Sequence, residues 1–158
     1  MVIAYIGLGS NLGNRRKNIE KALDYLNKID SVKVIKVSQL IETKPAGGPK
    51  QGKYLNAAAE IKTELSPEQL LESLKEIEKR LGRKQARVKW GPREIDLDIL
   101  FYGDKKIGKK DLKIPHPYLH ERYFVLKPLS EIAPEFIHPK IKKTVSQMLF
   151  ELEDEWLE

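Results

Sequence analysis

The sequence predicts an α+β fold in which helices pack on one antiparallel sheet, and three observations lead to this prediction. Strand-like and helix-like segments follow one another in the order β-α-β-β-α-β over residues 2–102. The strand-like segments are rich in β-branched residues or alternate apolar with polar ones. Each helix-like segment carries an apolar stripe at the 3–4 residue spacing of an amphipathic helix. This order is the ferredoxin-like pattern, a βαββαβ sandwich.

The first three predicted elements are a strand, a helix and a second strand. Residues 2–8 form a buried strand, and the glycine-containing residues 9–13 end it. Asn14 can cap the helix that follows, because its side-chain oxygen can accept a hydrogen bond from a free N–H of the first turn. Residues 32–41 alternate apolar with polar side chains, which predicts a second strand. The helix stripe consists of Ile19, Ala22, Leu23, Leu26 and Ile29.

The next three predicted elements are a strand, a helix and a strand. Residues 54–63 form the third strand. Residues 66–69 read Ser-Pro-Glu-Gln, a strong helix start, because Ser and Gln can form a reciprocal capping box and Pro suits the first helical position. Gly82 ends this helix. Residues 95–102 form the fourth strand of the pattern.

The remaining segments are less regular. Residues 104–110 are expected to form a charged hairpin or loop, and residues 124–132 and 145–152 to form short C-terminal helices on the rim of the sheet. Two long connections, residues 43–53 and 83–92, exceed what joining neighbouring elements requires. Loops of that length in a compact domain are often functional, so we expect both to act as lids.

Length and composition indicate a single domain spanning residues 1–158. The chain has 41% hydrophobic residues, no cysteine and no apolar run near the ~20 residues that cross a bilayer. Its first residues lack the basic region of a signal peptide. We therefore expect a cytoplasmic protein with no membrane partner. The net charge of +6 indicates an anionic partner, either a nucleotide or a nucleic acid. Oligomeric state is left open, with a monomer favoured.

An acidic pair in the fourth predicted strand is the most informative feature. Side chains alternate along a strand, so Asp96 and Asp98 stand on one face. Neighbouring carboxylates repel each other unless a cation lies between them, and magnesium takes one or two carboxylates together with substrate phosphates. Arg93 can fork onto a phosphate, and Trp90 adds a flat apolar surface. On the pair alone, a solvent-facing strand edge is an equally good interpretation.

Two glycine-containing segments are near misses to nucleotide-binding motifs. In residues 7–13 the third glycine comes one position late for G-x-G-x-x-G, so we reject that motif and favour a tight turn at Gly9 and Gly13. Residues 47–54 approach the P-loop pattern, but Tyr54 replaces the hydroxyl residue that would reach magnesium, and a strand follows where a helix should. Neither segment therefore predicts a nucleotide-binding fold.

Other residues could surround a substrate. Tyr54 and Asn56 share a strand face, and a ring beside an amide suits a flat heterocycle, although on its own an ordinary strand with a hydrogen-bonded Asn is the better interpretation. His116 alone is more often structural, and Phe124 is either a core residue or a second stacking ring. The basic side chains that could gather around a polyphosphate are Arg83, Arg87, Lys89, Arg93, His116 and Arg122.

Together these residues resemble the 6-hydroxymethyl-7,8-dihydropterin pyrophosphokinase family of folate biosynthesis. The likeness runs from residue 1 to about residue 135, and residues 89–100 are its most specific part. The supporting positions are residues 9–13, Thr43, Pro45, residues 54–58, Gly82, Arg83, Pro115, His116, Arg122, Phe124, Pro128 and Leu129. The family fold is the ferredoxin-like sandwich, in agreement with the order of elements above.

The resemblance implies an enzyme that transfers pyrophosphate from ATP, its co-substrate, to the hydroxymethyl group of the reduced pterin and releases AMP. It implies that two Mg²⁺ ions bind to Asp96 and Asp98. The implied catalytic residues are Arg83, Arg93, Asp96, Asp98 and His116. The implied ATP contacts are Glu78, Trp90, Arg93, Ile99, His116 and Arg122. The implied pterin contacts are Thr43, Pro45, Ala46, Tyr54, Asn56 and Phe124.

Two other functions stay open at this point. An RNA-binding module of the same fold would explain the positive charge, but the third predicted strand lacks the aromatic platform of RNA-recognition domains. A kinase that releases ADP, or an ATPase, would use the same acidic pair. With the pyrophosphokinase interpretation the partners are small molecules, ATP and the reduced pterin, and no nucleic acid is expected.

Overall fold

The computed structural model describes residues 1–43, 53–82 and 94–157, and its centre is a five-stranded antiparallel sheet. The strand order is β2-β4-β1-β5, and β3 also pairs with β4. This order places the first strand in the middle of the sheet, as the ferredoxin-like pattern predicts. The strands are β1 (Val2–Ser10), β2 (Val32–Val37), β3 (Ile41–Thr43), β4 (Tyr54–Thr63) and β5 (Asp96–Tyr102).

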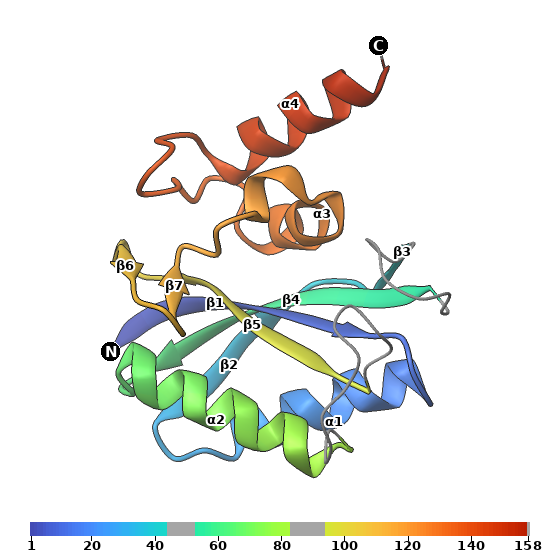
Figure 1. The fold of residues 1–158 in the computed structure, drawn as a ribbon, viewed down its shortest axis with the longest axis vertical. Helices are drawn as coiled ribbons and strands as arrows, with labels where there is room; N and C mark the ends of the chain where they lie inside the picture. The colour runs from blue at the N-terminus through green and yellow to red at the C-terminus, as the bar shows by residue number, and fades with distance from the viewer. Residues whose placement is uncertain (44–52, 83–93, 158) are drawn as a thin grey trace.

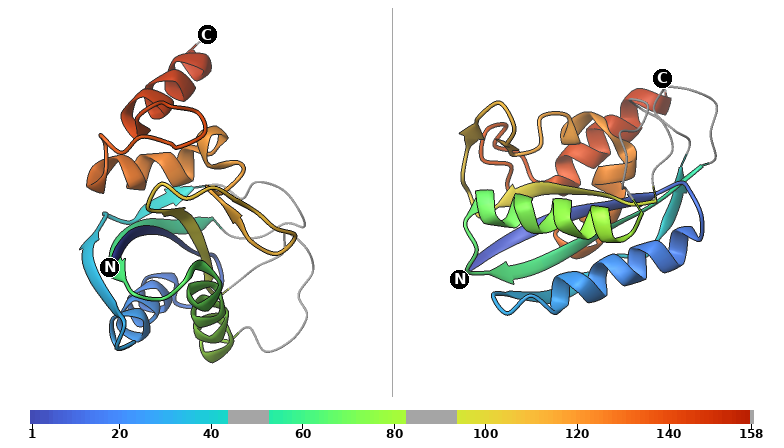
Figure 2. Two further views of the ribbon diagram at one scale, coloured as in Figure 1. Left: turned by 90° about the vertical axis from the view of Figure 1, so that its left-hand side faces the viewer. Right: turned by 60° about the horizontal axis from the view of Figure 1, so that its bottom comes forward.

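Helices lie on both faces of this sheet (Figure 1). On one face α1 (Arg15–Asn27) and α2 (Pro67–Arg80) lie next to each other. On the other face α3 (Tyr123–Ile132) lies across the strands, and α4 (Val145–Leu157) packs on the outer side of α3 (Figure 2). The sheet is therefore buried on both sides, with a separate apolar core on each.

The capping residues determine where the first two helices begin, as predicted. The side chain of Asn14 accepts a hydrogen bond from the backbone N–H of Lys17 at 3.1 Å. Ser66 and Gln69 form the complete capping box, with distances of 3.1 and 2.9 Å. Gly82 follows the end of α2 with φ of +123°, a left-handed backbone angle that glycine adopts without strain.

The prediction that the C-terminal helices lie on the rim of the sheet is wrong, because α3 covers one face of the sheet and α4 packs on α3. Leu126 and Leu129 of α3 are fully buried against the sheet face from which Ala58, Leu100 and Phe101 project. In β5, residues 99–102 are all buried in succession, which is typical of a strand covered on both faces. The apolar second face of the sheet requires a cover, and α3 supplies it.

The predicted strand over residues 32–41 is two strands separated by residues 38–40. Ser38 explains the break, because its Oγ accepts a hydrogen bond from the N–H of Ala58 at 2.9 Å while its own N–H donates to the carbonyl of Ala58 at 2.9 Å. The hydroxyl thus takes the place of a backbone carbonyl in the ladder. The next residue, Gln39, donates its N–H to Glu131 of α3.

The chain between β5 and α3 first returns beside β5. The charged segment predicted to form a hairpin or loop over residues 104–110 is the first part of a hairpin that extends further, with β6 (Ile107–Gly108) paired to β7 (Lys113–Ile114). A 3-10 turn (η1, Leu119–Glu121) precedes α3. In the described part of the chain, no helix combines the length and the apolar character needed to span a membrane.

Candidate active site

The two aspartates share one face of β5, as the alternation of the strand predicted. Asp96 pairs with Gly9 of β1, and Asp98 pairs with Gly7. Leu97, between them, points to the opposite face and is buried in the core formed with α1 and α2. Asp98 is exposed and Asp96 is half-buried, so the two carboxylates lie on the α3 side of the sheet at an end that solvent reaches.

Gly9, which pairs with Asp96 in the ladder, leaves room for side chains of β4 at this end of the sheet. A Cβ added to Gly9 would lie 2.9 Å from Oδ1 of Asn56 and 3.4 Å from Cδ1 of Tyr54, both on β4. The prediction of a tight turn at Gly9 is therefore wrong, since Gly9 belongs to β1 and is needed for close packing. Gly13, by contrast, has φ of +71° in the turn before α1, as predicted.

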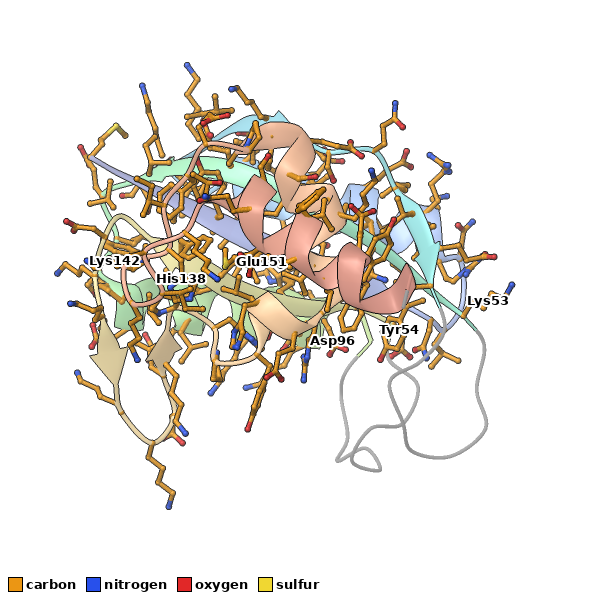
Figure 3. All side chains as sticks on the ribbon, turned by 90° about the horizontal axis from the view of Figure 1, so that it is seen from above. Lys53, Tyr54, Asp96, His138, Lys142 and Glu151 are labelled. Carbon is orange, nitrogen blue, oxygen red and sulfur yellow. The ribbon has the colours of Figure 1, made fainter. Side chains whose placement is uncertain are left out.

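The space above Gly9 brings three strands together. The hydroxyl of Tyr54 donates to Oδ2 of Asp96 at 3.4 Å, and Nδ2 of Asn56 donates to Oγ1 of Thr43 at 2.7 Å. Tyr54 and Asp96 lie near each other at one end of the sheet, far from His138 at the other end (Figure 3). Three of the predicted substrate residues, from β3 and β4, thus lie beside a predicted metal ligand from β5. We call Thr43, Tyr54, Asn56 and Asp96 the substrate cluster.

Glu78 reaches the same strand from α2. Its side chain is buried, and Oε2 accepts a hydrogen bond at 2.9 Å from the backbone N–H of Leu97, the residue between the two aspartates. Ile99 is 5% exposed and packs in the core on the α1 and α2 side, away from the aspartates. The predicted contacts of Glu78 and Ile99 with ATP stay predictions, and the structure adds that Glu78 holds β5 in place.

His116 lies beside β5, because its backbone N–H donates to the carbonyl of Leu100 at 3.1 Å. Its Nδ1 accepts a long hydrogen bond of 3.4 Å from the N–H of Tyr118, so Nε2 carries the proton of the neutral ring. Burial, with a smaller effect of the nearby charge of Arg122, lowers the pKa of His116 to about 4. The imidazole is therefore neutral at pH 7 and acts as a hydrogen-bond donor through Nε2.

Arg122 lies between two aromatic rings next to His116. Its guanidinium carbon is 5.4 Å from the ring centroid of Tyr118 and 5.7 Å from that of Phe124, distances typical of cation–π contacts. Phe124 is half-buried at the start of α3, so its ring is not a fully enclosed core residue. His116, Arg122 and Phe124 form a second group, on the connection from β5 to α3.

Several predicted residues lie outside the described residues. They are Pro45, Ala46, Arg83, Arg87, Lys89, Trp90 and Arg93, together with most of the two predicted lids, residues 43–53 and 83–92. Their predicted roles in binding ATP, the pterin or the phosphates stay predictions.

The acidic pair suits magnesium that is shared with phosphates. The described residues contain no group of three or more His, Cys, Asp or Glu side chains that could hold a metal ion. Magnesium does not require such a group, because it usually keeps several waters and binds one or two carboxylates plus substrate phosphates. Asp96, which is half-buried, and Asp98, which is exposed, pair with two glycines of β1 and fit that donor set.

Comparison with known proteins agrees with this geometry. The family model described as 7,8-dihydro-6-hydroxymethylpterin-pyrophosphokinase matches residues 5–134. The chain belongs to this family. Two named pyrophosphokinases illustrate the relationship. The 2-amino-4-hydroxy-6-hydroxymethyldihydropteridine pyrophosphokinase of Aquifex aeolicus is 46% identical over 147 residues, covering 93% of this chain and 90% of that protein. The Bacillus subtilis protein of the same name is 47% identical over 133 residues, covering 84% and 79%.

Solved structures of pyrophosphokinase domains share the fold. A Plasmodium falciparum HPPK-DHPS chain, crystallised with pterin and p-hydrobenzoate, superposes with a TM-score of 0.75 at 18% identity, covering 98% of this chain and 45% of that one. This chain thus spans less than half of that longer protein. The match confirms the ferredoxin-like arrangement of sheet and helices that the order of elements predicted.

Proposed function

We propose that this chain transfers pyrophosphate from ATP to the hydroxymethyl group of 6-hydroxymethyl-7,8-dihydropterin and releases AMP, a step of folate biosynthesis. Family membership supports this reaction class. The single observation that carries the proposal is the contact between Tyr54 and Asp96, which brings a predicted pterin residue to a predicted metal ligand. The acceptor and the phosphate chain would meet at this point.

The substrate cluster suits a flat, hydrogen-bonding heterocycle. Asn56 is 6% exposed and held by Thr43, so its amide is in a fixed position from which it can bond to the edge of a ring. Tyr54 and Phe124 are half-buried aromatic residues that we assign to the two faces of the pterin. A site built on strands positions such a ring more rigidly than a site built on loops.

The phosphate chain would lie over Asp96 and Asp98. We assign two magnesium ions to this pair, and when bound they neutralise phosphate charge and align the reacting oxygens. The neutral His116 would donate from Nε2 to a phosphate oxygen. Arg122, oriented by Tyr118 and Phe124, would add positive charge on the side of α3.

The reaction requires positioning more than covalent chemistry. The substrate hydroxyl oxygen bonds to the β-phosphorus, and the bond from that phosphorus to the oxygen shared with the α-phosphorus breaks. AMP leaves with the shared oxygen, and the hydroxyl proton passes to water or to a carboxylate of the site. Most of the rate enhancement would come from alignment and from neutralised charge, as in other phosphoryl transfers.

Nucleotide analysis tests the proposal directly. The chain is incubated with ATP, magnesium and the reduced hydroxymethylpterin, and the nucleotides are separated by chromatography. We expect AMP to form only when the pterin is present. Formation of ADP would instead indicate a kinase that transfers one phosphate or an ATPase, and the absence of any pterin-dependent product would reject the pyrophosphokinase.

The partners follow from the same proposal. We infer that ATP and the reduced pterin are the molecules the chain binds, that nucleic acid and membrane take no part, and that residues 1–158 act as a single domain. Consumption of ATP is consistent with the cytoplasmic location expected from the sequence. The net charge of +6 is consistent with attraction of a nucleotide triphosphate.

A further inference from the structure

Arg15, the first residue of α1, holds the ends of two strands together. Its Nη1 donates to the backbone carbonyl of Lys53, the residue before β4, at 2.8 Å. Its Nη2 donates to Oε2 of Glu42, in the middle of β3, at 2.8 Å. The planar guanidinium suits this double contact, because its donors are held in a rigid fork. We call Arg15, Glu42 and Lys53 the strand clamp.

The residues of the strand clamp are direct chain neighbours of the substrate cluster. Glu42 precedes Thr43, and Lys53 precedes Tyr54, while Thr43 and Tyr54 are paired in the ladder between β3 and β4. Thr43 accepts the hydrogen bond from Asn56, and Tyr54 donates to Asp96. A shift of β3 against β4 would therefore move Thr43 and Tyr54 in relation to each other.

The backbone of β3 alone gives weak control of this position. β3 has three residues, Ile41–Thr43, and among the described strands each is paired only with β4. Such a short edge strand has few backbone hydrogen bonds to hold its register. The clamp adds two charge-assisted contacts at the end where the substrate cluster lies. The hydrogen bond from Arg15 also lowers the pKa of Glu42, which keeps this carboxylate ionised and paired.

The clamp acts locally and contributes little to overall stability. The side chain of Arg15 is 32% exposed and that of Glu42 is 45% exposed, and ion pairs with this exposure contribute little to the free energy of unfolding. Lys53 also approaches Glu42, but its Nζ is 3.8 Å away and it is more exposed. The effect of Arg15 is thus expected on the position of β3 and not on whether the chain folds.

We propose that Arg15 is a positioning residue for the reduced pterin, acting through Glu42 and Lys53 on Thr43 and Tyr54. The inference rests on the proposed function, since the pterin is assigned to the substrate cluster by that proposal. It goes further in assigning a role to a side chain that is outside the cluster and that belongs to none of the predicted ATP, pterin or metal contacts.

The test compares Arg15→Ala with Arg16→Ala. Arg16 is the adjacent arginine of the same helix turn and is exposed, so its removal changes charge equally without touching the clamp. Amide hydrogen exchange is measured for residues 41–43 and 54–56. Affinity for the hydroxymethylpterin is measured by calorimetry with magnesium and the α,β-methylene analogue of ATP, in which the bond that breaks during the reaction is replaced.

We expect faster exchange at residues 41–43 and a pterin affinity about fivefold to tenfold weaker in Arg15→Ala, which is about 1 kcal/mol of binding free energy. Affinity for the ATP analogue and the unfolding midpoint should stay at the wild-type values. Arg16→Ala should match the wild type in every measurement, and Glu42→Ala should reproduce the effect of Arg15→Ala in part.

Two results would overturn the proposal, and they are distinguishable. If the wild type binds the pterin and Arg15→Ala binds it equally well, Arg15 has no positioning role. If Arg15→Ala weakens both ligands equally and lowers the unfolding midpoint, its role is general stability. If the wild-type chain binds no pterin, the proposed function itself is rejected. In that case the comparison of exchange rates at residues 41–43 between the wild type and Arg15→Ala still shows whether the clamp holds β3.

Discussion

The hydroxyl of Tyr54 contacts Oδ2 of Asp96 at 3.4 Å, and this contact passes over β1, which lies between their strands. Side chains on strands that are not neighbours meet most easily where the intervening strand has no side chain of its own. Gly9 supplies that gap, because it pairs with Asn56 on one side and with Asp96 on the other. The candidate active site thus depends on a missing side chain as much as on those present.

Gly9→Ala is therefore expected to reduce kcat/KM about tenfold or more while leaving the fold intact. The new Cβ would lie 2.9 Å from Oδ1 of Asn56, so the amide has to move out of its position. Steady-state kinetics with both substrates measures the loss. Gly108→Ala is the matched control, since a Cβ there has no atom within 4 Å, and it should behave as the wild type.

Asp98→Ala is expected to abolish turnover without unfolding the chain. The carboxylate is exposed, so its removal leaves no buried cavity. The Asp98 carboxylate is assigned to magnesium, which stabilises the transition state of such reactions by several kcal/mol. The rate of AMP formation should therefore fall by a factor on the order of 10³. Asp104→Ala removes another exposed aspartate just after β5 and serves as the control. Near-normal turnover in a folded Asp98→Ala chain would refute the metal assignment.

Ser38→Ala is expected to destabilise the fold by about 1–3 kcal/mol. The hydroxyl is buried and accepts the hydrogen bond of the Ala58 N–H, which the alanine variant leaves without a partner. Urea unfolding followed by circular dichroism gives the free energy. Ser130→Ala removes a half-exposed hydroxyl that only donates to a carbonyl of its own helix, and its effect should stay within about 0.5 kcal/mol.

Local patterns in the sequence predict the elements of this fold well. The extent of β5 and the start of α2 follow from β-propensity and from the capping box, both of which act within a few residues. The shared face of Asp96 and Asp98 follows from the period of a strand. Each of these features is determined by neighbours along the chain, so no knowledge of the tertiary structure is needed.

Features that depend on distant residues could not be predicted in the same way. The position of α3 across the second face depends on the cluster that Leu126 and Leu129 form with Ala58 of β4, which lies far from them in the chain. The clamp joins Arg15 to residues 27 and 38 positions away in the chain. No local pattern marks such pairs, because they are set by the register of β3 against β4 and by where α1 begins.

His138 provides a prediction for the dependence of stability on pH. The ring is 4% exposed, lies edge-on to Phe101, and its Nδ1 accepts the backbone N–H groups of Lys140 and Ile141, each at 3.1 Å. Burial, with smaller effects of the charges of His120 and Lys140, lowers the pKa of His138 from 6.5 to about 4. The folded state therefore favours the neutral ring.

The sign of the effect follows from this lowered pKa. Above pH 6.5 the ring is neutral in both states, and its contribution to stability is complete. As the pH falls from 6.5 towards 4, the unfolded chain takes up a proton that the folded chain does not, so stability is lost, by about 3 kcal/mol at most. His116 has a pKa lowered to about 4 as well and adds a loss in the same direction.

His138→Asn should flatten this dependence, because the amide oxygen of asparagine can accept the same two N–H groups and does not titrate. The difference in unfolding free energy between wild type and variant is measured in urea at steps from pH 7 to pH 4. We expect the wild type to lose stability relative to the variant across this range. A constant difference at every pH would mean that His138 is protonated equally in both states, and the neutral, buried ring would be ruled out.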